Sequence, residues 1–145
     1  MATILIVEDN EQLRIWLRTL LENKGHDVLE AEDGTKALAH LNLARPDLIV
    51  LDIYLPDKDG METLLHLRSS SQKFKILAIS GKFNGGTGTD ALAMILGASD
   101  TLAKPFTATV FIERVERVLT LAVEIRRRHH VVVIVAELVR WPKTG

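Results

Sequence analysis

The chain has 145 residues, of which 47% are hydrophobic and 26% are charged, and this balance excludes an intrinsically disordered protein. It contains no cysteine, which excludes a disulfide framework, a thiolate nucleophile and a zinc site with cysteine ligands. The formal net charge of −1 divides into +4 over residues 126–145 (five basic side chains and one acid) and −5 over residues 1–125, so a nucleic-acid surface is not expected on the main body.

The first part of the chain alternates between strand-like and helix-like patterns. An apolar strand is predicted over Thr3–Val7, and Asn10 is a suitable N-cap for a helix whose leucines recur every three or four residues up to Gly25. A more polar strand over Asp27–Ala31 is typical of a sheet edge. A short helix is then predicted over Gly34–Ala44, because a proline follows soon after it.

The second part continues the same alternation. Asp47–Leu51 is the most continuously apolar segment and is predicted to be the central strand. The remaining expected elements are, in chain order, a helix over Gly60–Ser70, a strand over Lys75–Ile79, a helix over Asp90–Leu96, a strand over Thr101–Ala103 and a last helix capped by Thr107. Five strands alternating with helices through short connections predict one α/β domain, a doubly wound parallel sheet with helices on both faces.

Chemically reactive side chains stand at the carboxyl ends of four of these strands, where ligands bind in an open parallel sheet. They are Glu8 with Asp9, Asp52, Ser80 and Lys104. A single acid in such a place is ordinarily a turn cap, but capping does not explain this many reactive groups on one edge. Clustered carboxylates repel one another, and one lysine cannot balance three acids. The pattern therefore predicts a divalent cation with oxygen ligands, for which Mg²⁺ is suited.

Four motifs give the chain a resemblance to a known family. They are ILIVEDN at residues 4–10, PDLIVLDIYLPDKDG at 46–60, ILAIS at 76–80 and DTLAKPF at 100–106. In this order and spacing they resemble the receiver domain of bacterial two-component response regulators, over Ala2 to about Leu119, and in particular single-domain receivers of the chemotaxis type. The resemblance implies a flavodoxin-like fold with five strands in the order 2-1-3-4-5.

The resemblance also implies a phosphoryl acceptor and its metal site. Asp52 would accept the phosphoryl group of a phosphohistidine, carried by a histidine kinase or a histidine phosphotransfer protein. Mg²⁺ would be held by Glu8, Asp9 and Asp52, with the backbone carbonyl of Tyr54 as a further ligand.

The other matched residues have supporting roles in the family. Ser80 and Lys104 would contact the oxygens of the phosphoryl group. Pro56 and Gly60 would shape the loop after the acceptor, and Pro105 would follow Lys104 through a cis peptide bond. We therefore expect these three residues to act structurally at the site.

The sequence departs from the family pattern at two places within the domain. Thr101 stands at the switch position, three residues before the matched lysine, where the family carries Tyr or Phe. An aromatic switch is therefore not expected. The glycine-rich segment Ser80–Asp90 is longer than usual, and Thr87 stands where a nucleotide-binding loop needs lysine, so we expect a connector and not a nucleotide site.

The sequence predicts a receiver domain over residues 1–125 and a basic, apolar extension over residues 126–145 of unknown structure. Three alternatives stay open for the extension. It could continue the last helix as a dimer arm, it could form a strand because Val131–Val135 has high β-propensity, or it could be a remnant without a role.

Together these inferences predict a stand-alone switch, controlled by phosphorylation, that signals through protein–protein contacts in the cytoplasm. We expect no enzyme activity beyond phosphotransfer to itself and slow autodephosphorylation. Direct binding to nucleic acid is not expected, because residues 1–125 carry a net negative charge. Association with a membrane is not expected either, because the sequence shows no signal peptide and no apolar run of roughly 20 residues. A homodimer through the last helix or the extension is one alternative. Others are a receiver fragment of a hybrid kinase or transcriptional regulator and, from another class, a flavodoxin-like ligand binder or metal-dependent hydrolase.

Overall fold

The computed structural model describes residues 1–53, 60–70, 73–81 and 88–121. Its strands form one parallel sheet in the order β2-β1-β3-β4-β5, which confirms the predicted topology. The strands are β1 (Thr3–Val7), β2 (Asp27–Ala31), β3 (Leu48–Asp52), β4 (Ile76–Ser80) and β5 (Asp100–Ala103). The helices are α1 (Glu11–Asn23), α2 (Gly34–Leu41), α3 (Gly60–Ser69), α4 (Thr89–Leu96) and α5 (Ala108–Thr120).

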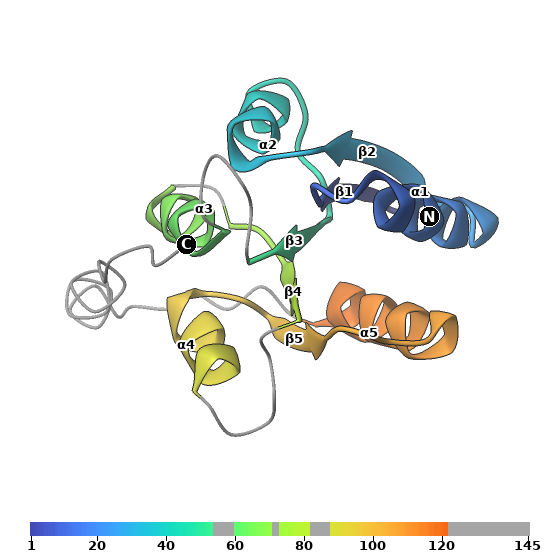
Figure 1. Ribbon diagram of the computed structural model, residues 1–145. Helices are drawn as coiled ribbons and strands as arrows, with labels where there is room; N and C mark the ends of the chain where they lie inside the picture. The colour runs from blue at the N-terminus through green and yellow to red at the C-terminus, as the bar shows by residue number, and fades with distance from the viewer. Residues whose placement is uncertain (54–59, 71–72, 82–87, 122–145) are drawn as a thin grey trace.

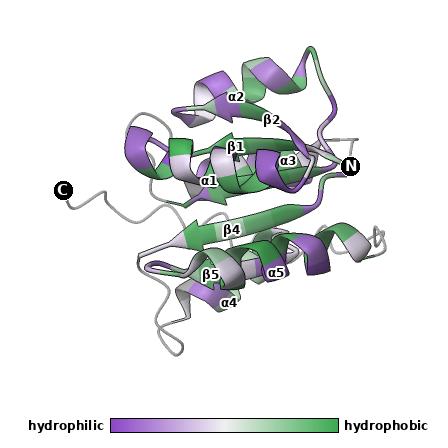
Figure 2. Ribbon diagram, turned by 90° about the vertical axis from the view of Figure 1, so that its right-hand side faces the viewer, coloured by the Kyte–Doolittle hydropathy of each residue, from purple (hydrophilic) through white to green (hydrophobic). Residues whose placement is uncertain are grey.

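The helices cover both faces of the sheet, with α1 and α5 on one side and α2, α3 and α4 on the other (Figure 1). Successive strand residues point to opposite faces, so each strand contributes to two hydrophobic cores. In β1, Ile4 and Ile6 pack with α1 and α5, whereas Leu5 and Val7 pack on the side of α2, α3 and α4. Figure 2 shows β1 and β4 as hydrophobic ribbons and more hydrophilic colouring on β2 and along the helices.

Side chains at the helix starts explain where the helices begin. The Asn10 side chain accepts a hydrogen bond from the Leu13 amide at 2.9 Å, and Thr107 accepts one from the Val110 amide at 3.2 Å, which confirms both predicted N-caps. Asp33 caps α2 in the same way through the Lys36 amide at 2.8 Å. This third cap was not predicted.

Some predicted boundaries are wrong by a few residues. The helix expected to reach Ala44 ends at Leu41, because the amides of Asn42 and Leu43 donate to carbonyls three residues back, those of Ala39 and His40, and not four residues back as in an α-helix. The strands expected over Asp47–Leu51 and Lys75–Ile79 lie one residue further along the chain, so Asp52 and Ser80, which were expected at the strand ends, are the last residues of β3 and β4. Both reactive side chains are therefore carried by backbone that is hydrogen bonded within the sheet.

Several sequence predictions lie outside the described residues. They concern Tyr54, Pro56, Thr87 and the extension over residues 126–145. Among the residues that are described, no helix is both long enough and apolar enough to span a membrane.

Candidate functional site

The parallel register brings the reactive residues to one edge of the sheet. Val7 is paired with Leu51, Asp52 with Ile79 and Ser80 with Ala103. Glu8 directly follows β1 and Lys104 directly follows β5. Residues that are far apart in the chain are thus neighbours at the carboxyl ends of the strands, as predicted.

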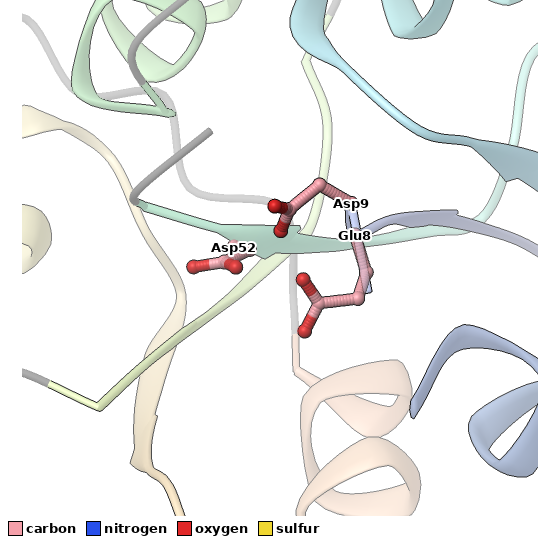
Figure 3. A group of neighbouring side chains, drawn as sticks. All are labelled: Glu8, Asp9 and Asp52. Carbon is pink, nitrogen blue, oxygen red and sulfur yellow. The ribbon is translucent and has the colours of Figure 1, made fainter. Parts of the chain in front are cut away.

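Three carboxylates converge at this edge. One oxygen from each of Glu8, Asp9 and Asp52 lies within 4.8 Å of the others, and the three side chains turn toward one another (Figure 3). Glu8 and Asp52 are buried, whereas Asp9 is exposed. The cluster is therefore open to solvent on the side of Asp9 and enclosed by the sheet on the other.

The Lys104 ammonium group contacts this cluster. Its Nζ atom lies 2.5 Å from Glu8 Oε1 and 3.2 Å from Asp52 Oδ2. Phe106, two residues further on, stacks between the buried Phe111 ring and the Trp16 ring, with centroid distances of 5.5 and 6.1 Å. The segment that carries Lys104 is thereby packed against α1 and α5.

The electrostatics of the site favour an additional cation. Burial raises the pKa of Glu8, and the neighbouring Asp52 carboxylate raises it further. Partial loss of solvation next to the protein and the Glu8 carboxylate raise the pKa of Asp9 in the same way. Burial lowers the pKa of Lys104, but its contacts with Glu8 and Asp52 outweigh this effect, so the pKa is raised overall. One ammonium group is thus shared among acids that repel one another.

The donor set and its dimensions fit a hard divalent cation. Mg²⁺ binds oxygen at about 2.0–2.1 Å, so two ligands on opposite sides of one ion are about 4.2 Å apart. Adjacent ligands of the same octahedral ion are about 3 Å apart, so the three oxygens, which lie within 4.8 Å of one another, would draw closer by up to about 2 Å around it. The three carboxylates are therefore compatible with Mg²⁺.

Ser80 and Thr101 occupy the neighbouring strand ends. Ser80 is fully buried, and its carbonyl accepts a hydrogen bond from the Lys104 amide at 2.9 Å. Both main-chain groups of Thr101 are bonded to side chains: the amide donates to Asp100 Oδ1 at 2.8 Å, and the carbonyl accepts from Arg114 Nη1 at 2.7 Å. Thr101 is half-buried, and the peptide bond between Lys104 and Pro105 is cis, as the resemblance implied.

Gly60 packs directly against the end of β3, beside Asp52. Its amide donates to the Ile53 carbonyl at 2.7 Å, and a Cβ atom at this position would overlap the Asp52 carbonyl oxygen and the backbone of Ile53. The first turn of α3 can approach the end of β3 this closely only because the residue has no side chain. The predicted structural role of Gly60 thus has a steric cause.

We expect Gly60→Ala to lower the free energy of unfolding by roughly 2–4 kcal/mol, because the added methyl group overlaps backbone atoms that cannot rotate away. Urea denaturation measures the loss. Gly81→Ala is the matched control, since a Cβ atom at Gly81 would have no atom within 4 Å and should change stability by less than about 0.5 kcal/mol. Equal effects of the two substitutions would contradict the steric explanation.

One contact to the site was not predicted. Arg14 in α1 reaches back and donates from Nη1 to the Glu8 carbonyl at 2.8 Å. A signal was present in the sequence, because Arg14 shares its helical spacing with the buried residues Leu17 and Leu21. A charged residue within an apolar stripe needs a polar partner inside the protein.

Comparison with known proteins identifies the family. Residues 4–116 match the response regulator receiver domain. The chain is 39% identical over 116 residues to the alkaline phosphatase synthesis transcriptional regulatory protein PhoP of Bacillus subtilis, an alignment that covers 80% of this chain and 48% of that protein. The chain therefore spans about half the length of this curated relative.

Solved structures agree with this match. The receiver domain of the Francisella response regulator 1452 superposes with a TM-score of 0.76 at 28% identity, over 82% of this chain and 97% of that one. The chemotaxis response regulator CheY4 of Vibrio cholerae gives a TM-score of 0.74 at 30% identity, over 81% and 98%. The chain belongs to the family of response regulator receiver domains, which act in two-component systems.

Proposed function

We propose that this domain is the phosphoacceptor switch of a two-component or phosphorelay system, with Asp52 as the acceptor. The observation that carries the proposal is the contact of Lys104 with both Glu8 and Asp52, beside a cluster of three carboxylates on one sheet edge. A lone capping aspartate would need neither the other acids nor the ammonium group.

The positions of these side chains support the following reaction. An oxygen of Asp52 attacks the phosphorus atom of a phosphohistidine, the bond from phosphorus to the imidazole nitrogen breaks, and the imidazole leaves as the neutral ring after taking up a proton. Lys104 pairs with one phosphoryl oxygen as a compact charge, and Ser80 donates its hydroxyl to another. Such a transfer depends mainly on positioning and on neutralising the equatorial oxygens.

Glu8, Asp9 and Asp52 are the residues of the described chain that would hold Mg²⁺, and the Tyr54 carbonyl is proposed as a further ligand. When bound, the ion supplies positive charge to the phosphoryl oxygens. Glu8 and Asp9 would place the ion beside Asp52, because they directly follow β1, which ends next to the strand that carries Asp52.

The wider context is also a proposal. The phosphoryl donor would be a histidine kinase or a histidine phosphotransfer protein, and the output would be contact with a protein target, in the cytoplasm. A homodimer through α5 or residues 126–145 is a further part of this proposal. Because the chain spans about half of its curated relative, a receiver within a longer transcriptional regulator or hybrid kinase is the second candidate. In either case, the domain itself would be no enzyme beyond its own phosphotransfer and dephosphorylation.

Radiolabelled acetyl phosphate tests the proposal directly. We expect the protein to retain one phosphoryl group per chain, to lose it in hydroxylamine as an acyl phosphate does, and to take up none when EDTA removes the metal. A metal-dependent hydrolase would instead release phosphate continuously without keeping the label. That outcome would contradict the proposed function.

A further inference from the structure

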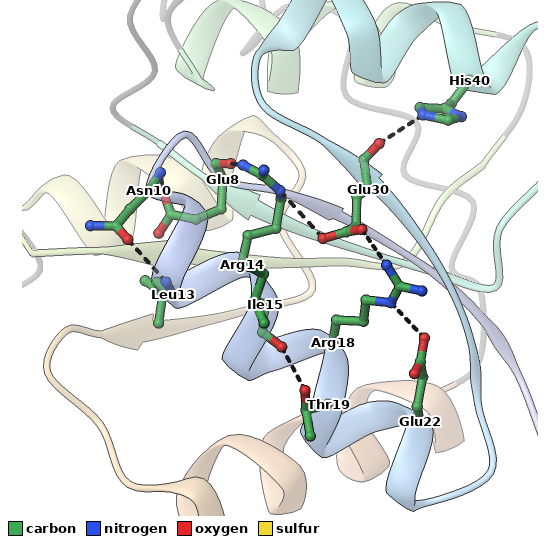
Figure 4. Close-up of polar contacts among 10 residues, drawn as sticks. All are labelled: Glu8, Asn10, Leu13, Arg14, Ile15, Arg18, Thr19, Glu22, Glu30 and His40. Atoms are coloured by element: carbon green, nitrogen blue, oxygen red, sulfur yellow. Dashed lines mark hydrogen bonds and ion pairs between the residues drawn. The ribbon is translucent and has the colours of Figure 1, made fainter.

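Arg14 connects the acid cluster to the neighbouring edge of the sheet. Its guanidinium lies one helical turn into α1 and points back toward the end of β1 (Figure 4). Nη1 donates to the Glu8 carbonyl at 2.8 Å, and the side chain is only 15% exposed. This guanidinium therefore bonds the main chain of a residue that carries one of the three carboxylates.

The guanidinium is itself held in place from the other side. Nε lies 3.4 Å from Glu30 Oε1, and Glu30 belongs to β2, where it is paired with Ile6 of β1. The second oxygen of Glu30 is paired with Arg18 Nη1 at 2.8 Å, and the Glu30 carbonyl lies 2.8 Å from His40 Nε2 of α2. Arg14 is thus paired with Glu30, whose carboxylate is also held by Arg18 and whose main chain is held by His40.

The main chain of Glu8 is consequently held at both of its polar groups. Its amide donates to the Ala31 carbonyl of β2 at 3.0 Å, and its carbonyl accepts from Arg14. That carbonyl belongs to the planar peptide that joins Glu8 to Asp9. The orientation of this plane is described by ψ of Glu8 and φ of Asp9, so it constrains how the two side chains are directed relative to each other.

We propose that Arg14 is a positioning residue for the acid pair, which fixes the Glu8–Asp9 peptide so that both carboxylates face Asp52. The proposal rests on the proposed function, because its purpose is to orient ligands of Mg²⁺. Partners that orient metal ligands typically change metal affinity by about 10- to 100-fold when removed. The alternative is an ion pair with Glu30 that contributes only to stability.

Arg18 provides the control that separates these two roles. It lies on the same helix and pairs with the same Glu30 carboxylate and with Glu22, and within the described part of the chain its polar contacts do not include Glu8. Arg14→Met and Arg18→Met therefore each remove one cation from Glu30, but only Arg14→Met releases the Glu8 carbonyl. Methionine keeps the apolar stem of the side chain in both variants.

The experiment measures the Mg²⁺ dissociation constant by calorimetric titration, together with backbone hydrogen exchange at Asp9 and Asn10 in metal-free protein. We expect Arg14→Met to weaken Mg²⁺ binding about tenfold and to speed exchange at both amides, while Arg18→Met stays within about twofold of wild type. Arg14→Lys should recover part of the affinity. Phosphorylation by acetyl phosphate at saturating Mg²⁺ should return toward the wild-type rate in Arg14→Met.

The possible failures are distinguishable. Wild-type protein that binds no Mg²⁺ would overturn the proposed function and this inference together. Normal Mg²⁺ binding in wild type with equal affinities in Arg14→Met and Arg18→Met would overturn the inference alone. If Arg14→Met does not fold, Glu30→Gln keeps the Arg14 guanidinium but removes the charge that anchors it, together with the ion pair to Arg18. It should then weaken Mg²⁺ binding about threefold, and unchanged affinity would again overturn the inference.

Discussion

Asp52→Asn should abolish phosphoryl uptake from acetyl phosphate, by at least about a thousandfold, while the protein remains folded. The amide has nearly the same shape as the carboxylate but lacks the anionic oxygen that attacks phosphorus. The substitution also removes one of three clustered acids that repel one another, so the unfolding free energy of metal-free protein should stay equal or rise. Intact-protein mass spectrometry and urea denaturation measure the two effects.

Asp27→Asn is the matched control for this substitution. Asp27 is an exposed aspartate at the start of β2, at the opposite end of the strands from the acid cluster. It should leave uptake and stability close to wild type. Phosphoryl uptake that survives in Asp52→Asn would place the acceptor at another residue, whatever the stability of the variant.

Lys104→Met should change phosphotransfer and metal binding in opposite directions. The ammonium group contacts Glu8 and Asp52, so it competes with any cation that approaches them. Its removal should raise Mg²⁺ affinity about tenfold, because a unit charge a few ångströms away contributes on the order of 1–3 kcal/mol near a protein surface. The phosphorylation rate should nevertheless fall about 100- to 1000-fold, since a charge that stabilises the transferring group is lost.

Calorimetry and acetyl phosphate kinetics give the two readouts on one protein preparation. Lys36→Met serves as the control, because Lys36 is exposed and pairs with Glu32 away from the site. A fall in Mg²⁺ affinity in Lys104→Met would mean that the lysine supports the metal ligands and does not compete with the ion. An unchanged phosphorylation rate would remove Lys104 from the transfer step.

The fold could be predicted because each element has a strong local signal. Asn10 and Thr107 are N-caps that need only their own helix, and the continuous apolar run before Asp52 indicates a strand buried on both faces. The strand ends then follow from the parallel arrangement, which alone suffices to bring Glu8 near Asp52. Ends such as that of α2 were missed because they depend on turn hydrogen bonds that no residue type specifies.

The finer structure of the site depends on contacts between distant segments. The closeness of Gly60 to the Asp52 carbonyl is a matter of how α3 meets β3, which local patterns do not encode. The bond from Arg14 to Glu8 depends in the same way on the position of Glu30 in a neighbouring strand. The identity of the reactive residues could thus be predicted from the sequence. The contacts that orient them, from Gly60 and Arg14, depend on tertiary packing and could not.

The bonds made by Thr101 have a consequence for self-association. β5 is an edge strand of the sheet, and edge strands pair with strands from other molecules when their amides and carbonyls are not already hydrogen bonded. At Thr101 both groups are already engaged by Asp100 and Arg114. A strand from another molecule would have to displace the Asp100 carboxylate and the Arg114 guanidinium before it could pair with β5 at Thr101. These two bonds therefore oppose aggregation through this edge of the sheet.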